Sequence, residues 1–198
     1  MNSENALRIG FLLVFASAVA VAGYHRWQAA KCRERLSRRD EGVAVFVLLR
    51  LFGLALWLGA LAYLIDPRWM AWSAVPLPSS IRWAGGVSGL ASVGLLYWTL
   101  RHLGKNLTDT VVTRAEHALV TTGPYRWVRH PFYVAVGLLI LSVFLLTANA
   151  LIGAAGLLVV VMLVVRTPIE ERKLVERFGE EYRAYMERTG RFWPRIGR

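Results

Sequence analysis

Five apolar stretches, separated by short polar connections, organise this chain. They cover about residues 7–24, 42–65, 81–100, 132–148 and 150–165. A helix that crosses a bilayer needs about 20 mostly apolar residues, so the pattern predicts about five transmembrane helices. The last two stretches are short and meet at Asn149, which predicts a helical hairpin with a tight turn.

The chain changes character after the fifth stretch. Residues 167–189 are rich in charge, and their apolar positions have the spacing of an amphipathic helix, interrupted by Gly179. Residues 167–170 fit the first turn of a new helix, with Glu170 as a cap. If the preceding helix continues instead, Arg166 and Glu170 lie on one face of it.

Composition and charge support a membrane protein. Hydrophobic residues make up 56% of the chain and charged residues 19%, below the roughly 25% of soluble domains. The net charge is +11, and most Lys and Arg residues follow the first, third and fifth stretches. The positive-inside rule places these regions in the cytoplasm and the N-terminus outside, so the charge does not require a nucleic-acid partner.

Three features narrow the possible functions further. A cleaved signal peptide would carry its positive charge before the first apolar stretch, whereas here the basic cluster follows it. Cys32 is the only cysteine, which excludes an intramolecular disulfide. The histidines and carboxylates lack the local spacing of metal ligands, so no metal site is expected.

Two clusters of polar residues are candidates for a catalytic or ligand-binding site. Pro131 fits the first turn of the fourth helix and disfavours helical geometry at His130, whose imidazole would then be free to meet a ligand. Arg166 and Glu170 could hold the two ends of a zwitterion. The alternatives are structural: Glu170 as a helix cap, Arg50 as a snorkelling or paired side chain, and inner-face anchors at Arg126, Arg129 and His130.

The C-terminal half resembles the isoprenylcysteine carboxyl methyltransferase family, which is related to membrane phospholipid methyltransferases. The matching segments, in order and spacing, are residues 103–104, 117–125, 129–133, 166–171 and 178–182, then a closing aromatic–proline segment. We therefore expect an all-α integral membrane protein of about five transmembrane helices with a cytoplasmic C-terminal amphipathic helix. One domain is expected over residues 1–198, with three spans in 1–102 and the cofactor-binding half in 103–198.

The resemblance implies S-adenosylmethionine as cofactor, bound on the cytoplasmic side. By motif position it implies cofactor contacts at His117, Ala118, Leu119, Val120, Tyr125, His130, Pro131, Phe132, Tyr133 and Glu170. It places Arg166 at the reaction centre, facing the substrate, as the catalytic residue. Glu170 could pair with the cofactor's ammonium, while His130 with Tyr125 or Tyr133 could bind its carboxylate. Thr110 departs from a glutamine that some relatives use at the cofactor.

Several functions remain open at this point. The first is methylation of a carboxylate of a prenylated or other lipid-like substrate drawn from the bilayer. A phospholipid amine is the second, and its methylation would need a base such as Glu171 or a nearby tyrosine. NADPH-dependent sterol reductases, which have a related C-terminal architecture, and non-catalytic membrane proteins are further alternatives. We expect the protein to lie in a prokaryotic cell membrane. Its expected partners are membrane lipids, and no nucleic acid is expected to bind.

Overall fold

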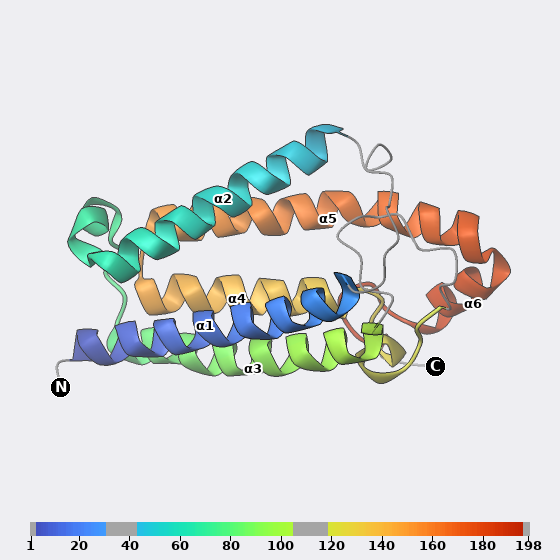
Figure 1. Cartoon of the computed structure of the whole chain (residues 1–198), viewed down its shortest axis with the longest axis horizontal. Coiled ribbons are helices and arrows are strands. Elements are labelled where there is room, and N and C mark those ends of the chain that lie inside the picture. Colours follow the sequence, from blue (N-terminus) through green and yellow to red (C-terminus); the bar gives the residue numbers. More distant parts are fainter. Residues whose placement is uncertain (1–2, 31–42, 105–118, 196–198) are drawn as a thin grey trace.

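The computed structural model describes residues 3–30, 43–104 and 119–195, and regular structure in these ranges is helical. The elements in order are α1 (Ser3–Ala30), α2 (Val43–Ile65), the 3-10 helix η1 (Pro67–Ser73), α3 (Ser79–Leu103), the 3-10 helix η3 (Gly123–Arg126), α4 (Pro131–Thr147), α5 (Ala150–Phe178) and α6 (Glu180–Arg188). Each of the five predicted stretches thus forms a helix. Figure 1 shows α1, α3, α4 and α5 lying lengthwise in the molecule, with α2 inclined across α5.

Three of the described helices are long and apolar enough to cross a membrane: Ser3–Gln28, Ala44–Ile65 and Ala150–Phe178, while Pro131–Thr147 is a shorter apolar helix. The predicted third span forms α3 but falls outside this set, because α3 carries small and hydroxyl residues that it uses against α4. Ser92 donates to the Ala135 carbonyl at 2.8 Å. A Cβ on Gly89 would lie 2.6 Å from Ser142 Oγ. Small residues at such an interface let two helix backbones approach closely.

The α4–α5 hairpin has the predicted tight turn. Ala148 adopts a left-handed conformation (φ 46°), and Asn149 caps α5 by accepting from Ile152 N at 3.1 Å. The Asn149 amide donates to the Met70 carbonyl (3.0 Å) and to Ser73 Oγ (2.7 Å). One buried side chain therefore joins the hairpin to η1. We call this end of the bundle the hairpin end, and the opposite end, where α6 lies, the C-terminal end (Figure 1).

The prediction that a new helix starts at Thr167 is wrong. Helix α5 continues through Pro168 to Phe178. Thr167 is fully buried and donates to the Leu163 carbonyl at 2.9 Å, as a residue inside a helix does. The break comes instead at Gly179 (φ 54°), where glycine accepts a backbone conformation that other residues avoid.

Candidate active site

The break before α4 has the predicted form. Pro131 is the first residue of α4, and His130 has non-helical backbone angles (φ −123°, ψ 58°). The His130 side chain is buried. Its ring stacks on that of Tyr133, with 5.3 Å between centroids and 20° between planes. The sequence order His-Pro-x-Tyr thus produces two stacked polar rings at the start of α4, which lies at the C-terminal end of the bundle.

Two successive carboxylates of α5 meet these rings. Tyr133 donates its hydroxyl to Glu170 Oε2 at 2.6 Å, and His130 Nε2 lies 3.3 Å from Glu171 Oε1. Arg166 lies one turn before Glu170 on the same continuous helix and is half-buried. The structure therefore brings together two segments, residues 130–133 and 166–171, that the sequence analysis selected separately.

Glu171 accepts hydrogen bonds from two arginine side chains, although the sequence analysis considered it only as a base for an amine substrate. Its Oε1 accepts from Arg129 Nε at 2.9 Å and Arg191 Nε at 3.2 Å, and its Oε2 accepts from the Arg191 guanidinium at 2.5 Å. Only 6% of its side chain is exposed. Its partners are 42 and 20 residues away along the chain, so no local spacing reveals them.

The C-terminal segment lies against the His-Pro break. Arg129 N donates to the Gly190 carbonyl (2.9 Å), and His130 N donates to the Arg191 carbonyl (3.1 Å). The Arg129 guanidinium also donates to the carbonyls of Met186 (3.1 Å) and Thr189, at the end of α6. The sequence therefore folds its last described residues back over the site.

Tyr125 lies in η3, which contacts α6 and α3. The hydroxyl of Tyr185 in α6 donates to the Tyr125 carbonyl at 2.6 Å. Gly123, which starts η3, has φ 62° and lies so near the His102 ring that a Cβ would come within 2.5 Å of it. Burial, and to a lesser extent the charge of Glu170, raises the pKa of Tyr125 above its usual value.

The tyrosines of α6 behave similarly. Burial raises the pKa of Tyr185 to about 12, and it also raises the pKa of Tyr182. Desolvation disfavours a charged phenolate. Tyr125, Tyr182 and Tyr185 therefore stay protonated at neutral pH and can donate hydrogen bonds, but they are poor general bases.

The other residues that were predicted to contact the cofactor lie in several parts of the chain. Pro131 is buried at the start of α4. Phe132 meets Tyr133 edge-on (centroids 6.1 Å apart) and packs on the core cluster that includes Leu100 and Ala135. Leu119 and Val120 are half-buried in the segment before η3. His117, Ala118 and Thr110 lie outside the described residues.

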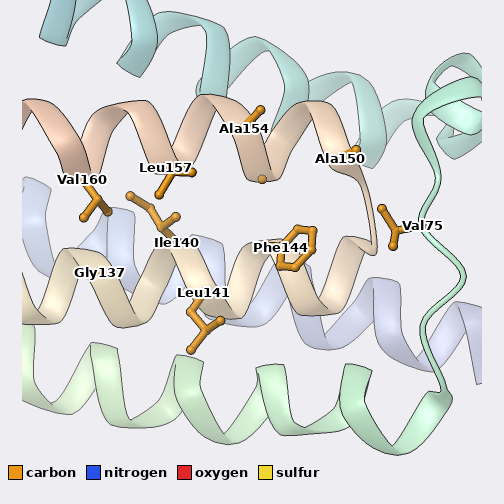
Figure 2. A pocket seen from close by; sticks show the side chains of 10 residues that line it. Val75, Gly137, Ile140, Leu141, Phe144, Ala150, Ala154, Leu157 and Val160 are labelled. Atoms are coloured by element: carbon orange, nitrogen blue, oxygen red, sulfur yellow. The ribbon is translucent and has the colours of Figure 1, made fainter.

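An apolar groove of about 510 Å³ runs between α4 and α5 toward the hairpin end (Figure 2). Its lining residues are all apolar and include Ile140, Phe144 and Leu157. At 3.6 residues per turn, Glu170 lies about 140° around α5 from Leu157. The groove thus offers space for hydrocarbon on a different side of α5 from the polar site.

Known proteins are similar to this chain in the part that contains the candidate site. Residues 88–176 match the model of the "Isoprenylcysteine carboxyl methyltransferase (ICMT) family". The cobalt-zinc-cadmium resistance protein CzcN of Cupriavidus metallidurans is 37% identical over 114 residues, which are 56% of this chain and 47% of that protein. The protein-S-isoprenylcysteine O-methyltransferase of Homo sapiens is 38% identical over 89 residues, 43% of this chain and 31% of the human protein. The chain spans about half the length, or less, of the curated relatives that it matches.

The fold agrees with a solved membrane protein. The eukaryotic intramembrane Ras methyltransferase ICMT superposes with a TM-score of 0.56 at 20% identity, over 94% of this chain and 68% of that one. With the three apolar helices long enough to cross a bilayer, this fold makes the chain an integral membrane protein. The resemblance to the isoprenylcysteine carboxyl methyltransferase family that the sequence predicted is confirmed for residues 88–176, which match the model of that family.

Proposed function

We propose that this protein is an S-adenosylmethionine-dependent integral membrane methyltransferase that methylates a carboxylate of a prenylated or other lipid-like substrate. The observation that carries the proposal is the bond from Tyr133 to Glu170 (2.6 Å), one turn after Arg166. It joins the two segments that the family resemblance assigns to cofactor and substrate.

The chemistry of the side chains fits the cofactor. An ionised carboxylate has about four acceptor positions, so Glu170 can bind an ammonium while it holds Tyr133. When bound, S-adenosylmethionine supplies a methyl group on a positively charged sulfur. The chain's part is to hold cofactor and acceptor in reactive geometry, which can lower a barrier by about 7–11 kcal/mol. In this proposal the cofactor contacts are Leu119, Val120, Tyr125, His130, Pro131, Phe132, Tyr133 and Glu170, with His117 and Ala118.

Arg166 is assigned to the acceptor. A guanidinium pairs with a carboxylate by two parallel hydrogen bonds and so fixes its orientation. A carboxylate acceptor is ionised at neutral pH and has no proton to remove before methylation. The raised pKa values of Tyr125, Tyr182 and Tyr185 favour this acceptor over an amine, which needs a base.

The topology follows from charge. We propose five spans, α1 to α5, in a single domain, with the N-terminus outside and the C-terminal end of the bundle in the cytoplasm. The basic residues of α5 and α6, among them Arg172, Arg177 and Arg183, gather at that end. Cofactor then arrives from the cytoplasm and the lipid-like acceptor from the bilayer.

Transfer of label from S-adenosylmethionine tests the function. Purified protein is incubated with methyl-labelled cofactor and a total membrane extract, and the lipid and peptide fractions are counted before and after mild base. Base-labile label indicates an ester and supports a carboxylate acceptor. Base-stable label on a headgroup amine would replace it with the phospholipid alternative, and no transfer at all would contradict the methyltransferase proposal.

A further inference from the structure

The charges around Glu171 determine its protonation state. Arg129 and Arg191 both donate to it, and arginine keeps its proton in proteins. Two guanidinium groups against one carboxylate hold Glu171 in its ionised form. An ionised carboxylate only accepts hydrogen bonds, so the ring nitrogen that faces it, His130 Nε2, must carry a hydrogen.

The same charge balance selects the neutral form of His130. Glu171 is already compensated by two cations, and His130 is only 6% exposed. An imidazolium there would place a third positive charge beside Glu171, whose single negative charge is already paired with Arg129 and Arg191. Burying an uncompensated charge is strongly unfavourable. The neutral imidazole with its hydrogen on Nε2 avoids this cost and leaves a lone pair on Nδ1.

Tyr133 follows the same logic. Its single hydroxyl hydrogen is directed to Glu170 Oε2, so its oxygen acts as an acceptor toward any other partner. The two stacked rings are thus each tied by their one donor to successive carboxylates of α5. Toward a ligand, these rings offer acceptors.

We propose that Glu171 is a positioning residue, which fixes His130 as the Nε2–H tautomer so that Nδ1 accepts a hydrogen bond from the bound cofactor. The inference rests on the proposed function for the identity of that ligand. It changes the role expected from the sequence, in which His130 and a tyrosine bind the cofactor's carboxylate. An acceptor at Nδ1 suits the cofactor's ammonium, which has three donors, beside the charge of Glu170.

Nitrogen NMR tests the tautomer directly. The chain has four histidines, so protein labelled with ¹⁵N-histidine in detergent gives few ring signals, and His130→Asn identifies those of His130. We expect a protonated Nε2 and an unprotonated Nδ1 without cofactor, and an upfield shift of Nδ1 when S-adenosylmethionine is added. A protonated Nδ1 in the cofactor-free protein, as the other tautomer or as imidazolium, would overturn the proposal.

Variants test the role of Glu171. Glu171→Gln keeps the size of the side chain but replaces one acceptor by a donor, and we expect it to give a mixture of His130 tautomers and at least tenfold weaker cofactor binding. Glu176→Gln, at an exposed position of the same helix, is the matched control and should change neither the His130 tautomer nor the cofactor affinity. Unaltered His130 signals and affinity in Glu171→Gln would refute the positioning role. Failure of the natural protein to bind S-adenosylmethionine, with the expected tautomer present, would refute the proposed function and the cofactor bond but not the tautomer assignment.

Discussion

Glu170 can lose its charge with almost no change of shape in the variant Glu170→Gln. The glutamine oxygen still accepts from Tyr133, so the 2.6 Å bond and the packing of α4 on α5 are retained. What disappears is the negative charge proposed to hold the cofactor's ammonium. A hydrogen bond to a charged group contributes about 1.5–3 kcal/mol, and about 1.4 kcal/mol corresponds to a factor of ten. We therefore expect S-adenosylmethionine to bind roughly 10- to 100-fold more weakly.

Titration calorimetry in detergent measures this effect. Glu176→Gln, at an exposed position six residues later on α5, removes the same charge from the protein and should leave the affinity within a factor of two. Tyr133→Phe keeps the charge of Glu170 but removes the bond that orients it, so it should lie between the two. Normal affinity in Glu170→Gln would show that Glu170 serves the packing of α5 and not the cofactor.

Three further variants test other parts of the structure. Arg166→Ala should keep cofactor affinity but lose methyl transfer by at least 100-fold, whereas equal loss of both would place Arg166 in the cofactor site. Asn149→Ala removes a helix cap and leaves the buried groups that Asn149 bonds without a partner, so the free energy of unfolding should fall by about 2–4 kcal/mol. Thermal unfolding in detergent measures this change, and Asn5→Ala, at an exposed position, is the control. Gly190→Ala would place a Cβ 1.7 Å from the Trp193 carbonyl oxygen and should weaken cofactor binding at least tenfold by displacing the C-terminal segment. Gly94→Ala has no atom within 4 Å of the new Cβ and should bind normally; equal affinity in both glycine variants would exclude the C-terminal segment from the site.

The helices could be predicted from the sequence because their signals are local. Runs of apolar residues produced the five stretches, and Pro131 together with Asn149 marked two helix starts within a residue. The error at Thr167 and Pro168 has a physical cause. Their pattern favours a helix start in an isolated segment, but α5 packs along both α2 and α4, and this packing outweighs the local preference and the one hydrogen bond that Pro168 removes.

The site could be predicted only in part, for the same reason. Arg166 and Glu170 share a face by helical periodicity, so their proximity followed from the sequence once the helix was taken as continuous. The partnership of Glu171 with Arg129 and Arg191 depends on how α4, α5 and the C-terminal segment come together. That arrangement has no periodic signal, and two adjacent glutamates in a charged stretch look like any solvated helix face.

The same cluster supports the proposed acceptor class. An amine acceptor requires a group that can take up a proton, and the sequence pointed to Glu171 or a tyrosine for this purpose. Glu171 is committed to two guanidinium groups and faces the His130 ring, so protonating it would leave buried positive charge uncompensated. Burial keeps Tyr125, Tyr182 and Tyr185 in the phenol form. Glu171 and these three tyrosines are thus poor bases, which favours an acceptor that arrives without a proton to lose, as a carboxylate does.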